Sequence, residues 1–177
     1  MNLPTREEAI KLMFEAGCSQ SVIDHCLIVS KVAMNLIQEL KTHGIQVDST
    51  LVEIGALMHD IGRSKTHSVE HGVVGGEIAR KKGLPELLAK IIERHVGAGI
   101  TEDEAERIGL KRGNYVPETL EEKIVAYADK LVEGSRQVDL EVTVEKFRKE
   151  LGEDHPAIER LRSLQNEIVS LFEVNSL

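Results

Sequence analysis

The sequence of 177 residues contains no tryptophan, and aromatic residues make up only 3% of it. Ala, Leu, Ile, Val and Glu dominate instead, and this mixture favours helices over a sheet sandwich. The two cysteines, Cys18 and Cys26, are too few for a disulfide framework or a sulfur-ligated metal site. Cys26 falls on an apolar helical stripe, so we interpret it as a small core residue.

Long apolar runs and basic runs are also missing. No apolar run approaches the ~18 residues needed to cross a bilayer, and the N-terminus lacks the basic-then-apolar pattern of a signal peptide. A cytoplasmic protein without membrane contact is therefore expected. The formal net charge is −8, and the 22 basic residues are dispersed. General nucleic-acid binding is not expected, because it needs a basic surface. A small phosphorylated substrate is compatible with this negative net charge, since a metal ion and a few basic side chains can attract it locally.

Helical patterns separated by short turns fill the sequence. Thr5 and Glu8 form a capping box that opens a helix to about Ala16. Further helices are expected at about 20–43, 49–60, 68–82, 84–95, 101–108, 119–138, 143–151 and 156–174. No segment of useful length has the period of a strand. The sequence predicts one all-α domain over residues 1–177, in which the helices of 139–175 belong to the same domain. The apolar stripe of the last helix either closes the core or pairs two chains as a homodimer.

Six ionisable residues lie on the apolar faces or at the ends of these helices. They are His25, His59, Asp60, His71, His95 and Asp129. One such residue alone is more often a hydrogen-bonded core group than a ligand, but here five helices contribute. Imidazole and carboxylate together suit a divalent transition metal such as Fe, Mn, Co, Ni or Zn, and Mg is a further candidate. The other histidines, His43, His67 and His155, are interpreted as ordinary surface residues.

Two neighbouring ligands need an interrupted helix. Adjacent side chains on a regular helix point ~100° apart, so His59 and Asp60 can face one ion only where the helix ends. Gly62 follows two residues after Asp60 and tolerates the dihedral angles with which a chain leaves a helix.

These residues resemble the H…HD…D signature of the HD superfamily of metal-dependent phosphohydrolases, in its HDIG branch. His25, the run His59-Asp60-Ile61-Gly62 and Asp129 agree with it in order and spacing over about residues 20–135. The resemblance implies an HD-domain helical bundle in which His25, His59, Asp60 and Asp129 hold a metal. Similarity to binuclear members implies that His71 and His95 hold a second ion, with Asp60 as the bridging catalytic residue. One or two ions are therefore expected.

Departures from the family pattern limit the substrate. The HD-GYP phosphodiesterases carry two successive histidines where this chain has Arg94-His95, and it lacks the GYP segment, which argues against cyclic-di-nucleotide cleavage. Hydrolases of diadenosine tetraphosphate commonly have a threonine after that histidine, whereas this chain has Val96. Residues beyond about 138 match nothing in the family.

The activity that the resemblance implies is hydrolysis of a small phosphorylated substrate, with a nucleotide preferred, by attack of metal-bound hydroxide on phosphorus. Arg63, Lys65 and Arg94 are candidate substrate-binding residues, although for Arg63 and Lys65 a solvated loop is an equally good interpretation. Phosphomonoesterase, phosphodiesterase and dinucleoside polyphosphate hydrolase remain open. The alternatives are a non-catalytic nucleotide- or metal-binding HD-type sensor module and a plain helical interaction domain.

Overall fold

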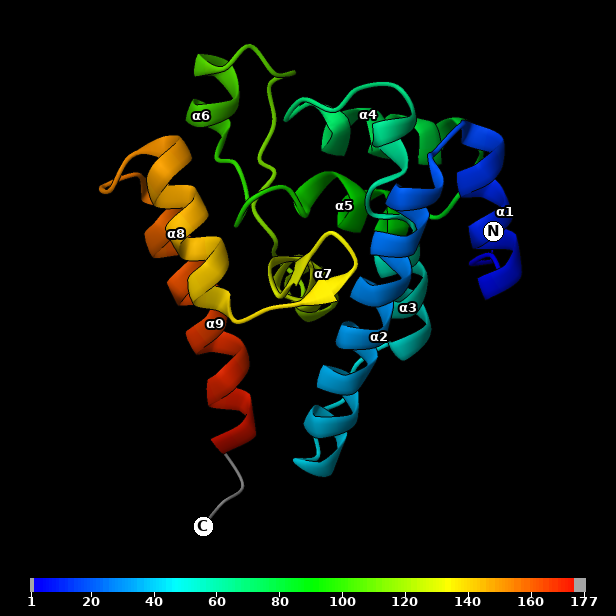
Figure 1. The fold of residues 1–177 in the computed structure, drawn as a ribbon. Coiled ribbons are helices and arrows are strands. Elements are labelled where there is room, and N and C mark those ends of the chain that lie inside the picture. Colours follow the sequence, from blue (N-terminus) through cyan, green and yellow to red (C-terminus); the bar gives the residue numbers. More distant parts are fainter. Residues whose placement is uncertain (1, 174–177) are drawn as a thin grey trace.

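Helices take up most of residues 2–173, the part of the chain that this computed structural model describes (Figure 1). They are α1 (Arg6–Ala16), α2 (Gln20–Thr42), α3 (Ser49–Met58), the short 3₁₀ helix η1 (Ile61–Ser64), α4 (His71–Lys81), α5 (Glu86–Arg94), α6 (Glu102–Arg107), α7 (Leu120–Lys130), α8 (Leu140–Leu151) and α9 (Pro156–Glu173). The predicted all-α fold is confirmed. Within residues 2–173, no helix is long and apolar enough to span a membrane.

Side-chain caps explain where most of these helices begin. The hydroxyl of Thr5 accepts from the backbone N–H of Glu8, whose side chain accepts in return, and Thr101 opens α6 with the same capping box. Ser19, Asp48 and Thr119 each accept one backbone N–H at the start of α2, α3 and α7. These contacts satisfy donors that a helix start would otherwise leave unpaired. The caps could be predicted because each joins residues only three positions apart.

The segment after α7 differs from the prediction. The helix expected to reach 138 ends at Lys130, and a short antiparallel hairpin pairs Val132–Glu133 with Arg136–Gln137. Gly134 turns the hairpin with φ +58, a conformation that suits glycine. Thr143 was expected to begin the next helix, but α8 begins at Leu140, and the Thr143 hydroxyl donates to the Lys130 carbonyl at 2.6 Å. Two-residue strands are too short to show an alternating sequence pattern.

The remaining boundaries lie close to the predicted ones. Helix α4 begins three residues later than expected, at His71. The last helix was expected to reach residue 174, which lies outside the described residues. The apolar stripe of α9 lies in the main core, so within this chain it closes the core. Its buried members are Ile158, Leu161, Leu164 and Ile168.

Helix α3 forms the centre of the core. Seven of its residues are buried, and it packs against α1, α2, α5 and α7. A helix that is apolar on nearly every side is stable only when other elements surround it. Figure 1 shows α2 running alongside α3, with α8 and α9 on the opposite side of α7. This packing fixes the position of the residues that follow α3, which are His59 and Asp60.

Gly62 allows η1 to lie directly against the start of α4. A Cβ atom at this position would lie 1.8 Å from the carbonyl oxygen of His71 and 2.7 Å from the backbone nitrogen of Gly75. Because both neighbours are backbone atoms, neither can move aside without displacing α4. The absence of a side chain at residue 62 therefore sets the distance between Asp60 and His71.

Replacing Gly62 by alanine should destabilise the protein and misplace His71. We expect a loss of at least about 1–3 kcal/mol in the free energy of unfolding, the usual cost of overpacking. Denaturant unfolding measures this loss. The matched control is Gly109→Ala, where φ is +77 but no atom lies within 4 Å of the new Cβ. Equal losses in the two variants would contradict the close-packing argument.

Candidate metal centre

Six predicted ligands converge from four helices and the turn after α3. His25 comes from the middle of α2, and His59 and Asp60 come from the turn that ends α3. His71 is the first residue of α4, His95 follows the last residue of α5, and Asp129 lies in the last turn of α7. Far apart in sequence, these positions meet at one place because the helices that carry them pack around α3. The structure thus brings all six residues together.

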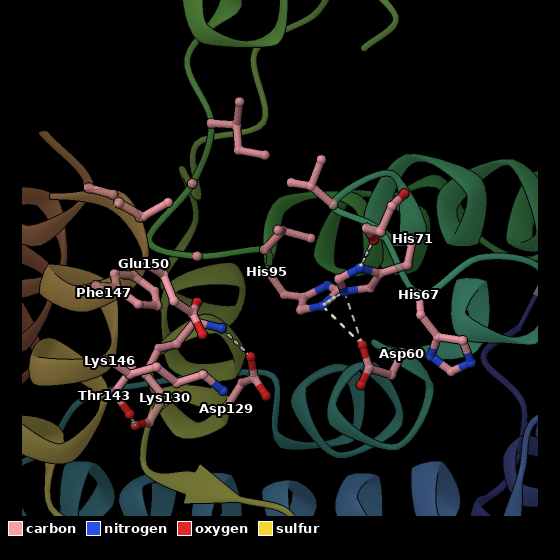
Figure 2. A pocket seen from close by; sticks show the side chains of 18 of the residues that line it. Asp60, His67, His71, His95, Asp129, Lys130, Thr143, Lys146, Phe147 and Glu150 are labelled. Atoms are coloured by element: carbon pink, nitrogen blue, oxygen red, sulfur yellow. Dashed lines mark hydrogen bonds and ion pairs between the residues drawn. The ribbon is translucent and has the colours of Figure 1, made fainter. Parts of the chain in front are cut away.

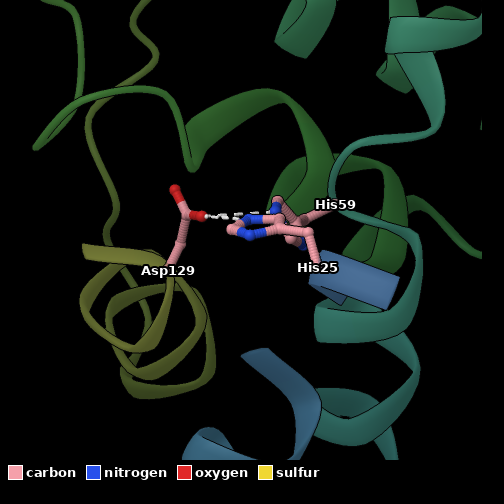
Figure 3. A group of neighbouring side chains, drawn as sticks. All are labelled: His25, His59 and Asp129. Carbon is pink, nitrogen blue, oxygen red and sulfur yellow. Dashed lines mark hydrogen bonds and ion pairs between the residues drawn. The ribbon is translucent and has the colours of Figure 1, made fainter. Parts of the chain in front are cut away.

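The first ligand group contains His25, His59 and Asp129 (Figure 3). The Asp129 Oδ1 atom lies 2.9 Å from His25 Nε2 and 3.4 Å from His59 Nε2. All three ligand atoms lie within 4.8 Å of one another, so a single ion can contact all of them. The two imidazole rings meet edge to face, with their centroids 5.4 Å apart.

The second ligand group contains Asp60, His71 and His95 (Figure 2). Asp60 Oδ1 lies 3.2 Å from His71 Nε2 and 3.3 Å from His95 Nε2, and these two nitrogens are 3.1 Å apart. The other oxygen, Asp60 Oδ2, lies 3.7 Å from His59 Nε2 in the first group. One carboxylate therefore faces both groups, as a bridging ligand requires.

Backbone carbonyls fix the orientation of all four imidazole rings. In each ring, Nδ1 lies within hydrogen-bond distance of a carbonyl oxygen. The distance is 2.7 Å from His25 to Gly134, from His59 to Ala56 and from His71 to Ser68. It is 2.6 Å from His95 to Ile92. A carbonyl can only accept, so Nδ1 must carry the proton. Each Nε2 therefore faces the centre and is the atom that can offer a lone pair to a metal ion, the arrangement typical of metal-binding histidines.

Two buried polar atoms test whether these residues fit a metal ion. His59 Nε2 and Asp60 Oδ1 are both buried without a hydrogen-bond partner. Leaving such an atom unsatisfied costs about 1–3 kcal/mol, and more for a charged group. An imidazole nitrogen without its proton and a carboxylate oxygen are both acceptors, so in that state they cannot satisfy one another. A divalent cation satisfies them together, and the mixed nitrogen and oxygen donor set suits one.

The buried groups of the centre shift one another's pKa values. Burial opposes the charge of His59, but Cys26, Asp60 and Asp129 outweigh this effect and hold its pKa well above the usual value, so a metal ion must displace a proton from His59. Burial opposes the charge of Asp60, but the neighbouring imidazoles outweigh this effect and hold its pKa well below the usual range. Burial likewise opposes the charge of Asp129, and Lys130, His25 and His59 outweigh it and lower its pKa. For His95, burial lowers the pKa to about 4. At neutral pH, both carboxylates are therefore ionised and His95 is neutral.

Cys26 lies next to the metal centre, which the sequence did not predict. Its sulfur forms a third group of potential ligand atoms with His59 and Asp60, and all three residues are buried. Burial raises the pKa of the Cys26 thiol, which keeps it protonated. The apolar stripe of α2 predicted a core residue, and only the packing of α2 against the end of α3 brings the sulfur to the ligands.

A cavity of about 930 Å³ opens onto both ligand groups. Arg63 lines it and donates from Nε to Asp60 Oδ2 at 2.7 Å. His67 and His155, which were interpreted as ordinary surface residues, also line the cavity. Lys65 is exposed and is not among the residues that line it.

Arg94 also lies outside the lining of the cavity. Its guanidinium is buried and forms ion pairs of 2.9 Å with the carboxylates of Glu118 and Glu122. The side chain of Glu122 is only 2% exposed, so the Arg94–Glu122 pair is a buried contact between α5 and α7. Arg94 was predicted to bind the substrate, but in the structure its guanidinium is engaged by the carboxylates of Glu118 and Glu122.

Replacing both His71 and His95 by alanine should halve the amount of metal bound per chain, because only the first ligand group stays complete. Elemental analysis of the purified variant measures the ratio. His67→Ala is the matched control, since His67 lies on the cavity wall but belongs to neither ligand group. An unchanged ratio in the double variant would indicate one ion held by the first group alone.

Replacing Arg94 by glutamine should act on stability. Removing one partner of a buried ion pair costs about 3–5 kcal/mol, because the other charge is left buried and unpaired. We expect a lower Tm together with an unchanged KM for any substrate the protein hydrolyses. A raised KM at an unchanged Tm would instead show that Arg94 contacts the substrate.

Comparisons with known proteins agree with this geometry. A family model described as HD domain matches residues 22–134. An uncharacterized protein of Methanocaldococcus jannaschii is 52% identical over 155 residues, which cover 88% of this chain and 92% of that protein. The tRNA (cytidine(56)-2'-O)-methyltransferase of Picrophilus torridus is 39% identical over 170 residues, which cover 96% of this chain and 48% of the enzyme. The chain thus spans about half the length of that relative.

A solved structure shows the same fold. The HD domain of the Listeria monocytogenes phosphodiesterase PgpH, in complex with cyclic-di-AMP, is similar with a TM-score of 0.56 at 16% identity. The match covers 96% of this chain and 98% of that domain. The matched family segment contains all six converging residues, from His25 to Asp129. This chain belongs to the HD domain family.

Proposed function

We propose that this protein is a metal-dependent phosphohydrolase that acts on a small phosphorylated substrate, with nucleotides as the substrate class. One observation carries the proposal: the carboxylate of Asp60 faces two separate groups of imidazole nitrogens, one with each oxygen. His25, His59 and Asp129 would hold one ion, and His71 and His95 would hold the other, with Asp60 shared between them. Divalent ions at these positions lower the pKa of water and stabilise charge on phosphoryl oxygens.

The protein itself contributes orientation and charge. Asp60 and Asp129 would repel a phosphate group, so productive binding depends on cations that compensate them. Arg63 lines the cavity, and its Nε–H holds Asp60, so we assign its terminal amino groups to a substrate phosphate. Lys130 forms an ion pair with Asp129 and also lines the cavity, and its charge lowers the pKa of that carboxylate. Lys65 and Arg94 do not line the cavity, so neither is assigned to substrate binding.

The size of the cavity supports an organic phosphate. A volume of about 930 Å³ lies at the upper end of the range that small-molecule sites occupy. The PgpH HD domain, which has the same fold, was solved in complex with a nucleotide, cyclic-di-AMP. Monoester, diester and diphosphate cleavage would use the same six ligands, because these residues act on phosphorus and leave the recognition of the organic part to the cavity walls.

A non-catalytic sensor module is the second candidate. It would be favoured by the loss of a metal ligand, and the described chain retains every one of the six. The fixed orientation of the four imidazole rings by backbone carbonyls also favours catalysis, since precise ligand orientation tunes a metal for chemistry.

Replacing Asp60 by alanine should abolish hydrolysis and lower the amount of bound metal, because both ligand groups lose the carboxylate between them, while the helical circular dichroism signal stays close to that of the wild type. The assay pairs elemental analysis with a screen of phosphomonoesters, dinucleoside polyphosphates and cyclic nucleotides in the presence of Mn²⁺. Asp103→Asn is the matched control, because Asp103 is exposed on α6. Full activity of the Asp60 variant, or a wild-type protein that hydrolyses nothing in the screen, would overturn the proposal.

A further inference from the structure

The cavity has a second wall that lies outside the segment matched by the HD domain family. Helices α8 and α9 form this wall, and the matched segment ends at residue 134, before α8 begins. Six residues of α8 line the cavity, and four of them are Thr143, Lys146, Phe147 and Glu150. Their spacing of three, four and seven positions places them on one face of the helix. Figure 2 shows this face opposite the histidines and beside Asp129 and Lys130.

Lys146 offers a charge that is not engaged elsewhere. Most other cations of the cavity are paired: Lys130 with Asp129, Arg63 with Asp60 and Arg160 with Glu104. Lys146 is exposed on the cavity wall, and no ion pair involves it among residues 2–173. An exposed ammonium group with several free donors can bind a phosphate oxygen.

Phe147 places an aromatic ring in the same wall. The chain has only three phenylalanines, and this one is half-buried, in contact with the main core on one side and with the cavity on the other. Exposed aromatic rings in nucleotide-binding grooves stack against bases, and such stacking tolerates any base because every base has a π face. The adjacent Val142 and Leu151 line the cavity as well and are 44% and 46% exposed.

We propose that the α8 face formed by Lys146 and Phe147 is a recognition subsite for the non-reacting part of a nucleotide. Phe147 stacks against the base, and Lys146 binds a phosphate oxygen that faces away from the ligand groups. The inference rests on the proposed function for the position of the reacting phosphate. It assigns substrate selection to α8 and the chemistry to the ligands on α2 to α7.

A first experiment tests base binding without hydrolysis. Saturation-transfer NMR with metal-free protein detects contact with adenosine, guanosine, cytidine or uridine, none of which carries a phosphate. We expect a signal from base protons with the wild type, a loss of that signal in Phe147→Leu and its retention in Phe14→Leu. Leucine preserves apolar packing but removes the aromatic ring, and Phe14 is 51% exposed on α1. Absence of a signal from all four nucleosides, or an unchanged signal in Phe147→Leu, would overturn the subsite.

A second experiment separates the two side chains. With metal-loaded protein, Phe147→Leu should raise KM for nucleoside monophosphates about tenfold, the usual effect of losing one stacking contact, while KM for glycerol phosphate stays constant. Lys146→Gln should raise KM for both substrates, and kcat should change little in either variant. The matched control is Lys149→Gln, because Lys149 is exposed on α8 away from this cavity.

The outcomes distinguish the two proposals. If the wild type hydrolyses neither nucleoside monophosphates nor glycerol phosphate, the result counts against the proposed function, and the nucleoside signal still tests the subsite. If hydrolysis occurs but the ratio of the two KM values is the same in Phe147→Leu and the wild type, the phosphohydrolase stands and the base-binding role of Phe147 is wrong.

Discussion

The carboxylate of Asp60 is the constraint on which the rest of the structure depends. It is buried, its pKa is held well below the usual range, and its two oxygens face imidazole nitrogens from three other positions in the chain. A buried negative charge is costly unless cations or donors meet it. Here three Nε2 atoms are directed at the carboxylate, because backbone carbonyls hold the Nδ1 side of each ring. The arrangement suits a bound cation, as the proposed function requires.

The packing of the helices fixes the positions of Asp60 and its neighbouring histidines. Helix α3 is buried on nearly every side, so its end is fixed, and the chain leaves the helix at His59 and Asp60. Gly62 then lets η1 touch the first turn of α4, where His71 stands. Adjacent residues on a continuous helix would diverge by ~100°, so the release of the chain is what allows both ligands to face the centre.

The proposed chemistry and the proposed recognition subsite lie in different parts of the chain. The six candidate ligands lie within the segment that matches the HD domain family, whereas Lys146 and Phe147 lie beyond it on α8. A metal centre tolerates little change, because each ligand must keep its type and orientation. A cavity wall can change its side chains without disturbing that centre. Such a division would allow one set of metal ligands to serve different phosphate esters.

The sequence by itself predicted most of the helices and the six residues that converge, because these features depend on short-range spacing or on polar residues that interrupt an apolar face. Only the tertiary structure decided that two carboxylates hold Arg94, that Cys26 lies beside His59, and that a hairpin follows Lys130. It also placed Phe147 opposite the ligands. These contacts join residues far apart in the chain, and the periodicity of one helix carries no information about which other helix its face will meet.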